Sequence, residues 1–333
     1  MKKIVELPLL EPLYSTYHSQ GPATAIIVNN PSIQNWYFSQ VLMLTCTTAF
    51  LNGYSSPQIG IVDSSWENNP FFDQKAFHTR ILKGYTHQVI RNLLDLGFYV
   101  CFKDIDDYYI KGKTWYHERH FPHDGCICGY NQIDQTYCIY AYDQSWVYRK
   151  FWTPKESFDA GMRAMFKKGK FNNIWGLKVK RDPVDFSSYI ALSKIDEYLN
   201  SSLKNQMETT SETIYGIRVH DYIVKYGEML QAGIIPYEKT DRRVLRMLWE
   251  HKKVMHRRLQ LIEQDLALDT SLSDAYTSVV KDADTARILY ASHCLKRRDE
   301  LLSIITKKIT SIKEHECDLL TALLKRSKGG KIQ

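Results

Sequence analysis

Two polar residues stand at the ends of neighbouring apolar runs, where together they could form a general base. His123 begins and Asp143 ends the segment HDGCICGYNQIDQTYCIYAYD, whose two halves have the composition of β-strands. A hairpin with about nine residues in each arm would bring these two ends together. An aspartate that accepts a hydrogen bond from one imidazole nitrogen leaves the other nitrogen to act as a base. In the simpler interpretation, His123 only starts a strand and Asp143 only caps a turn.

A second segment, NWYFSQVLML at residues 35–44, has the pattern of the first turns of a buried helix. We expect this helix to run to the Asn52-Gly53 pair, a typical helix stop. On it, Ser39 would lie one turn after Asn35 and on the same face. Cys46 would lie about three turns further along, roughly 16 Å away by the helical rise. Ser39 is therefore a weak candidate nucleophile, and Cys46 is expected in the core.

Taken together, the helix that begins Asn-Trp-Tyr-Phe-Ser, the strand-start His123 and the later Asp143 resemble the papain-like fold. The resemblance is greatest to the butirosin-biosynthesis acyltransferase N-terminal domain family, and more distant to the bacteriocin-processing cysteine peptidases. The segments HDGCICGYN and YCIYAYD carry it, with Asn131 where the turn Asp of the family is usual. It spans most of the first 155 residues. The later segment EHKKVMHRRLQLIE also resembles helices of relatives from peptide and polyketide antibiotic clusters.

The resemblance implies a role for each matching position. His123 falls on the general base, Asp143 on its orienting partner and Asn35 on the nucleophile. Asn29 falls where papain-like enzymes keep an oxyanion-stabilising Gln, and Trp36 and Ser39 would line the substrate site. An amide cannot replace a thiolate near neutral pH, so the usual covalent acyl-enzyme is not expected.

Two functions follow from this departure. In the first, the protein transfers an acyl group from a carrier-protein thioester to an amine or hydroxyl in peptide or polyketide natural-product biosynthesis. His123 would deprotonate the acceptor, which attacks the thioester directly. In the second, the protein is a catalytically inactive papain-fold pseudoenzyme that serves as a binding or scaffold protein. Neither function calls for a cofactor.

The thiols and histidines of the first half suggest two further chemistries. Cys126, Cys128 and Cys138 would sit on the hairpin, where a free thiol is usually a small hydrophobe. His117, His120 and His123 recur at spacings of three residues and have the atom type for zinc. That spacing in a proline-containing loop is no recognised ligand pattern, so we expect no metal.

A basic segment in the second half could bind an acidic partner such as an acyl or peptidyl carrier protein. The alternative is an ordinary solvated helix face. Its cations are Arg242, Arg243, Arg246, Lys252, Lys253, Arg257 and Arg258.

The composition places broad limits on the protein. Its 333 residues are 44% hydrophobic and 24% charged, which indicates about two packed domains rather than disorder. The net charge of +7 is low for a dedicated nucleic-acid binder, so we expect none as a partner. The N-terminus lacks a signal-peptide pattern, and no apolar run of 18 residues predicts a membrane span. A cytoplasmic protein with free thiols is expected.

The order of elements predicts an α+β fold: a papain-like domain at residues 1–155, then a helical domain at 156–333 packed on it. In the first, we expect an extended segment at 24–30, a helix at 73–97 and strands at 98–102, 124–131, 136–143 and 145–152. The helices expected in the second span residues 154–168, 185–203, 214–231, 240–266 and 271–324.

Overall fold

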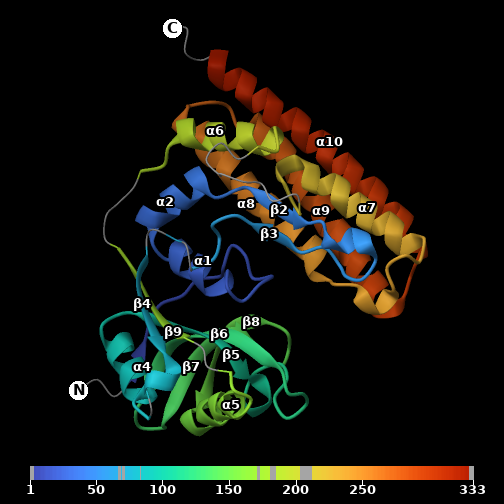
Figure 1. The fold of residues 1–333 in the computed structure, drawn as a ribbon. Coiled ribbons are helices and arrows are strands. Elements are labelled where there is room, and N and C mark those ends of the chain that lie inside the picture. The colour runs from blue at the N-terminus through green and yellow to red at the C-terminus, as the bar shows by residue number, and fades with distance from the viewer. Residues whose placement is uncertain are drawn as a thin grey trace. The chain divides into compact units, whose positions relative to one another are not determined.

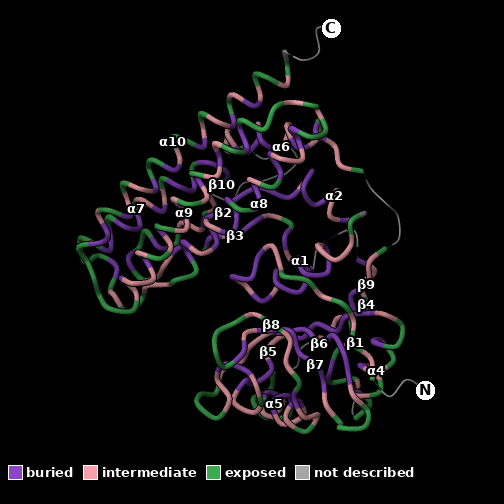
Figure 2. The backbone as a smooth tube through the Cα atoms, turned by 180° about the vertical axis from the view of Figure 1, so that it is seen from behind, coloured by how far each residue is buried: buried purple, intermediate pink, exposed green. Residues whose placement is uncertain are grey.

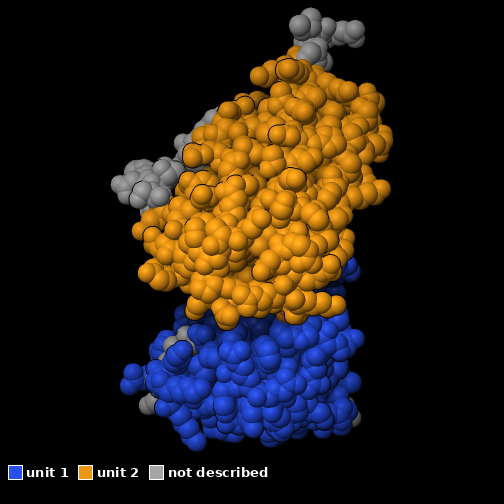
Figure 3. Space-filling view, turned by 90° about the vertical axis from the view of Figure 1, so that its right-hand side faces the viewer, with its two compact units in different colours: residues 1–34, 63–183 blue, residues 35–62, 184–333 orange. Residues whose placement is uncertain are grey.

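A computed structural model describes residues 4–66, 69, 72–82, 84–170, 173–180, 185–202 and 212–329. It confirms the α+β class, with an antiparallel sheet of seven strands in the first half and helices in the second (Figure 1). The chain divides into two compact units (Figure 3). Unit 1 holds residues 1–34 and 63–183, and unit 2 holds residues 35–62 and 184–333. The division therefore differs from the expected domains 1–155 and 156–333, because segment 35–62 groups with the helices and residues 156–183 group with the sheet.

The seven-stranded sheet of unit 1 is antiparallel throughout. Its order is β4-β9-β5-β6-β7-β8, and the short strand β1 also pairs with β6. The four strands expected from β-rich runs are all present as β5, β6, β7 and β8. The strands are β1 (Ile4–Glu6), β4 (Phe72–His78), β5 (Tyr99–Asp106), β6 (Pro122–Asn131), β7 (Thr136–Tyr142), β8 (Tyr148–Pro154) and β9 (Asn173–Val179).

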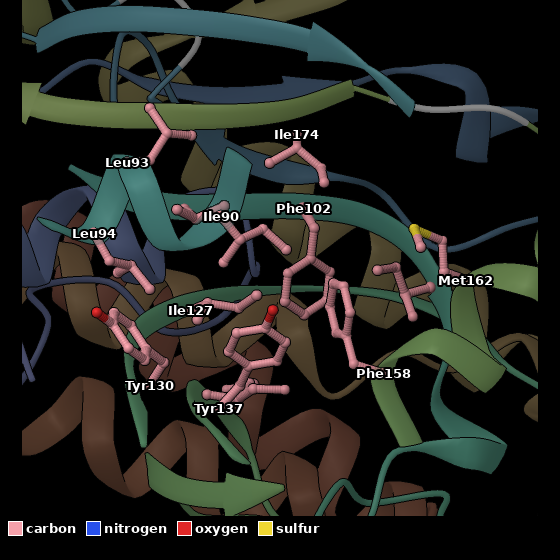
Figure 4. Packing of buried hydrophobic residues seen from close by; sticks show 14 of the residues in the cluster. Ile90, Leu93, Leu94, Phe102, Ile127, Tyr130, Tyr137, Phe158, Met162 and Ile174 are labelled. Carbon is pink, nitrogen blue, oxygen red and sulfur yellow. The ribbon is translucent and has the colours of Figure 1, made fainter. Parts of the chain in front are cut away.

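Helices α4 (Thr86–Asp95) and α5 (Lys155–Lys167) cover one face of this sheet. Their apolar side chains and those of the strands together form the hydrophobic core (Figure 4). On α4, the buried Ile90, Leu93 and Leu94 recur at helical spacing and form an apolar stripe. Leu93 approaches Gly176 on β9 so closely that a Cβ there would lie 2.9 Å from its side chain. The strand glycine thus lets the helix pack close to the sheet.

Two expected elements in unit 1 have a different structure. Residues expected to be extended form α1 (Gly21–Val28), in which seven of eight residues are buried (Figure 2). A short run that is apolar all round has no period to separate helix from strand, although the proline near its start was a helix signal. The helix expected at 73–97 is instead β4, the short helix α3 (Thr79–Leu82) and α4. Asp73 pairs with Lys178 on β9 rather than capping a helix.

Segment 35–62 also differs from the single helix expected there. Helix α2 (Pro31–Gln40) ends early, strand β2 (Leu44–Thr47) follows, and a 3₁₀ helix η1 (Ala49–Asn52) comes next. Gly53, with φ of +81°, ends η1, so the Asn52-Gly53 stop is confirmed for this shorter element. Strand β2 lies between β3 (Ile59–Ile61) and β10 (Thr213–Tyr215) in a separate three-stranded sheet.

Unit 2 is otherwise helical, as expected. Ser187 caps α6 by accepting a hydrogen bond from the Ile190 N–H at 3.3 Å. The long C-terminal segment is two helices, divided where Arg297 adopts a left-handed conformation. The helices are α6 (Ser188–Leu199), α7 (Val219–Gln231), α8 (Arg243–Asp265), α9 (Ser271–Lys296) and α10 (Glu300–Gly329). Short 3₁₀ helices are η2 (Asp107–Tyr109), η3 (Gly216–Arg218) and η4 (Tyr237–Lys239).

Within the described ranges, none of the helices combines the length and the apolar character that crossing a membrane requires.

Candidate functional site

His123 lies at the start of β6, as expected, and its Nδ1 is 2.8 Å from Oδ2 of Asp107. The antiparallel pairing of β5 with β6 creates this contact. It sets Ile105 opposite His123 and Asp106 opposite Pro122. Asp107 is the first residue after β5, which brings its carboxylate to His123. The carboxylate accepts from Nδ1–H, which assigns that tautomer and leaves Nε2 as the basic nitrogen.

A buried lysine holds the carboxylate in place. Lys113 Nζ lies 3.2 Å from Oδ1 of Asp107 and donates to the main-chain oxygen of Asp124 at 2.8 Å. The side chains of Lys113 and Asp107 are almost wholly shielded from solvent. A buried pair of this kind needs both charges compensated. Oδ2 of Asp107 bonds to the His123 imidazole, whereas Oδ1 is within ion-pair distance of Lys113 and has no hydrogen bond. We therefore regard Asp107 as the acceptor that orients His123.

Aromatic rings surround the imidazole of His123. The ring of His18, in the turn before α1, has its centroid 3.8 Å from that of His123. Phe121 lies 5.1 Å away on the same measure, and Tyr142 and Tyr148 flank His18. Only 22% of the His123 side chain is exposed, so the base is accessible from a restricted direction. Such partial exclusion of water strengthens electrostatic interactions at the base.

Asp143 has a different role from the one expected. Its Oδ1 accepts hydrogen bonds from the backbone N–H groups of Ser145 and Val147, at 2.8 and 3.0 Å, and its Oδ2 binds Nε of Arg149. Burial alone would raise the pKa of Asp143, but these hydrogen bonds and the guanidinium outweigh it and lower the pKa. The prediction of Asp143 as the orienting residue is therefore wrong. Asp143 stabilises the β7–β8 turn, and Asp107 takes its place beside His123.

The residues assigned around the nucleophile position occupy ordinary helix positions. Asn35 is the fifth residue of α2 rather than its first, and Trp36 is half-buried beside it. Ser39 is buried, donates to the Asn35 carbonyl at 3.0 Å and accepts from the Ser187 N–H at 2.9 Å. These bonds use its hydroxyl structurally, which removes Ser39 as a nucleophile. Asn29 is the C-cap of α1, where its backbone N–H bonds to Ala25.

Asn35, Trp36 and Ser39 belong to unit 2, whereas His123 and Asp107 belong to unit 1. Convergence of Asn35 with His123 stays a prediction.

The cysteines of the first half are all buried, so none of them is a candidate nucleophile. Cys46 lies on β2, not on the helix of Asn35, and burial raises its pKa to about 12. Cys126, Cys128 and Cys138 are fully buried on the hairpin, as expected of small hydrophobes. Burial raises the pKa of Cys126, and the contact with Cys138 and burial together raise that of Cys128. Cys101 on β5 is also fully buried.

The three histidines of the loop have separate partners. His120 Nδ1 lies 2.9 Å from Oδ2 of Asp106, and the His117 ring stacks on Tyr116. In the ranges that the structure describes, no three His, Cys, Asp or Glu side chains are grouped so that they could hold a metal ion. The zinc alternative therefore has no supporting geometry in these ranges.

Only some of the cations in the basic segment on α8 are exposed to solvent. Lys252 and Arg258 are fully buried, so they are removed from the expected docking residues. Arg258 donates to the carbonyls of Phe38 and Val41, at 2.7 Å for Phe38. Arg246 is half-buried and pairs with Glu250 at 3.2 Å. Exposed cations remain at Arg242, Arg243, Lys253 and Arg257.

Comparison with models of protein families found no match, and a search of curated proteins also found none. The papain-like assignment therefore rests on the sequence resemblance alone.

Sequence reasoning missed Asp107, Lys113 and His18. A signal for Asp107 was present, because the acidic pair Asp106-Asp107 comes a few residues after the β-run at 98–102. Both β5 and β7 are neighbours of β6, so only the side-chain contacts of the folded chain show which carboxylate meets His123. For Lys113 and His18 we find no local signal.

Proposed function

We propose that unit 1 carries a general base, His123, and that the protein uses it to transfer an acyl group from a thioester to an amine or hydroxyl. The contact of His123 Nδ1 with Asp107, which Lys113 holds in turn, is the observation that supports the base. The acyl-transfer chemistry comes from the resemblance to the butirosin-biosynthesis acyltransferase family.

The reaction needs no enzyme thiol. His123 Nε2 removes a proton from the acceptor as its nitrogen or oxygen attacks the thioester carbonyl. The carbon–sulfur bond then breaks, and the imidazolium returns the proton to the leaving thiolate. Asp107 stabilises the imidazolium between these two transfers. Asn29 of unit 1 would serve as the donor to the oxyanion, as the resemblance implies.

An acidic carrier protein is the proposed donor, as the resemblance implies. The exposed Arg242, Arg243, Lys253 and Arg257 would steer it by charge, without the buried Lys252 and Arg258. Rim charges of this kind act mainly on the rate of association and on its salt dependence.

A binding or scaffold protein without catalysis is the second candidate. The observation that favours it is that Asn35, at the nucleophile position of the resemblance, lies inside α2 and cannot react. In this case the buried Lys113–Asp107 pair would serve only the fold of unit 1.

The two candidates are separated by a transfer assay with an N-acetylcysteamine thioester as donor and hydroxylamine as acceptor. Release of thiol is followed with a chromogenic disulfide. His123→Ala should slow acceptor-dependent release by roughly 10²–10⁴-fold, the usual contribution of a general base. His120→Ala is the matched control, because it removes a second His–Asp pair nearby.

We expect His120→Ala to leave the rate unchanged. If both variants match the unmodified protein, or if no thioester is consumed above background, the transferase function is wrong and the binding function replaces it.

A further inference from the structure

Three aromatic side chains continue outward from His123 in unit 1. The centroid of Phe121 lies 5.1 Å from that of His123, Trp115 lies 6.1 Å from Phe121, and Trp146 lies 5.3 Å from Trp115. Each distance is within the range of direct ring contacts. We call Phe121, Trp115 and Trp146 the aromatic row.

The outer end of the row is open to solvent and is held in position. Trp146 is 51% exposed, whereas Trp115 and Phe121 are half-buried. The backbone of Trp146 takes a left-handed φ of 60°, and the Trp146 N–H donates to the Asp143 carbonyl at 3.0 Å. The hydrogen bonds of the Asp143 carboxylate to Ser145 and Val147 tighten the same turn. Asp143 therefore places Trp146 rather than orienting His123.

A positive charge lies against the row. The Arg119 guanidinium carbon is 5.6 Å from the Trp115 ring centroid and 5.4 Å from that of Phe121. Arg119 is exposed, and no ion pair among the described residues includes it. A guanidinium that stacks on aromatic rings keeps its N–H groups for a carboxylate or phosphate.

We propose that the aromatic row and Arg119 bind the non-reacting part of the substrate, a planar ring system that carries an anionic group. The ring would stack on Trp146 and meet Trp115 at its edge, because the two indole rings are perpendicular, and Arg119 would pair with the carboxylate or phosphate. This inference rests on the proposed function, because it assigns the reacting end of the substrate to His123. Two features support it: the row is continuous with His123, and its one adjacent cation lacks an acidic partner within the described residues.

The test is equilibrium binding of 2-naphthoate, followed by quenching of tryptophan fluorescence and by calorimetry. Trp146→Ala should weaken binding about tenfold, since stacking of one ring on an aromatic side chain contributes on this scale. Arg119→Gln should weaken 2-naphthoate to the level of neutral 2-naphthalenemethanol. Cyclohexanecarboxylate, an anion without a flat ring, should bind about tenfold more weakly than 2-naphthoate.

Trp152→Ala is the matched control. Trp152 is 41% exposed on β8 and lies outside the row, so its loss should not change binding. Both tryptophan variants are at exposed positions, and circular dichroism would verify that they fold. If Trp146→Ala and Trp152→Ala weaken binding equally, if Arg119→Gln has no effect, or if 2-naphthoate does not bind, the inference is wrong.

Failure of this inference is distinguishable from failure of the proposed function. His123→Ala should retain 2-naphthoate binding while losing transfer. Binding through the row without any transfer would overturn only the catalytic proposal. Transfer from a thioester that carries an anionic aromatic ring, if unaffected by Trp146→Ala, would overturn only the row.

Discussion

Lys252 and Glu316 form an ion pair in the interior of unit 2, with Nζ 2.5 Å from Oε2 and neither side chain exposed. Helices α8 and α10 supply the two charges. Tyr198 on α6 donates to the same carboxylate at 3.0 Å, and Tyr276 on α9 donates to its other oxygen. His220 on α7 lies 3.5 Å from Oε2. One carboxylate thus joins five helices, and burial lowers the pKa of Lys252 while Glu316 opposes that shift.

Glu316→Gln should strongly destabilise unit 2. It leaves the Lys252 ammonium buried without a counter-charge, which typically costs about 3–5 kcal/mol. Chemical denaturation monitored by circular dichroism would measure the loss. Glu314→Gln, at an exposed position of the same helix, is the control and should change the unfolding free energy by less than about 0.5 kcal/mol. Equal effects of the two variants would show that the ion pair does not contribute to the unfolding free energy.

Stability should fall as the solution becomes more acidic than about pH 6.5. Burial, and then the charge of Lys252, hold the pKa values of His251 and His220 well below the usual 6.5. Geometry explains the shift for His251, because Nε2–H donates to the Leu42 carbonyl at 2.8 Å and Nδ1 faces Lys252 Nζ at 3.4 Å. A proton on Nδ1 would oppose the ammonium.

The sign follows from linkage. Below about pH 6.5 the unfolded chain protonates these histidines and the folded chain does not, so the unfolded state binds more protons. Their contribution is full above the unfolded pKa and is lost as the pH falls toward the depressed folded values. Each histidine adds up to about 1.4 kcal/mol per pH unit. Unfolding free energies at pH 7.5 and 5.0 would measure this, and His251→Gln should reduce the slope. A slope that the variant leaves unchanged would contradict the assignment to His251.

The two aspartates near the proposed site should separate kinetically. Asp107→Asn removes the group that orients His123 and should lower kcat by about 10²–10⁴-fold with the N-acetylcysteamine thioester. Asp143→Asn loosens the turn that carries Trp146 and should raise KM for a ring-bearing substrate while changing kcat little. The measurement is a steady-state comparison of both variants. A larger kcat loss for Asp143→Asn than for Asp107→Asn would restore the original pairing.

Transfer should survive alkylation of the accessible thiols. Cys101, Cys126, Cys128 and Cys138 are buried in unit 1, and the direct-attack mechanism uses none of them. Iodoacetamide treatment of the folded protein should therefore leave the rate unchanged, and incubation with the acyl thioester should add no acyl mass. Intact-protein mass spectrometry would detect an adduct. An acyl adduct on any residue would replace direct attack by a covalent mechanism, with that residue as the nucleophile.

Patterns of neighbouring residues in the sequence were enough to predict much of the secondary structure of this protein. The strands β5 to β8 follow from β-rich runs between polar turns, and their order predicts an antiparallel sheet. Helices α5, α7 and α8 follow from apolar residues at helical spacing with recognisable ends. His123 at a strand start could be named from this pattern. These features depend on periods of two and 3.6 residues and on turn chemistry, which neighbouring residues decide.

Tertiary structure decided what depends on distant partners. The sequence of β4 has a helix-like pattern. It forms a strand because it pairs with β9, about a hundred residues later in the chain. The buried surroundings of α1, rather than its periodicity, made an apolar run a helix. Asp107 meets His123 through the pairing of β5 with β6. Asp143 follows β7, the other neighbour of β6, but its carboxylate binds the β7–β8 turn and Arg149 instead. Lys252 looked like a surface cation, and only Glu316, 64 residues later, makes its burial possible. Long-range pairing of charges and strands leaves no local pattern, because its partners meet only in the folded chain.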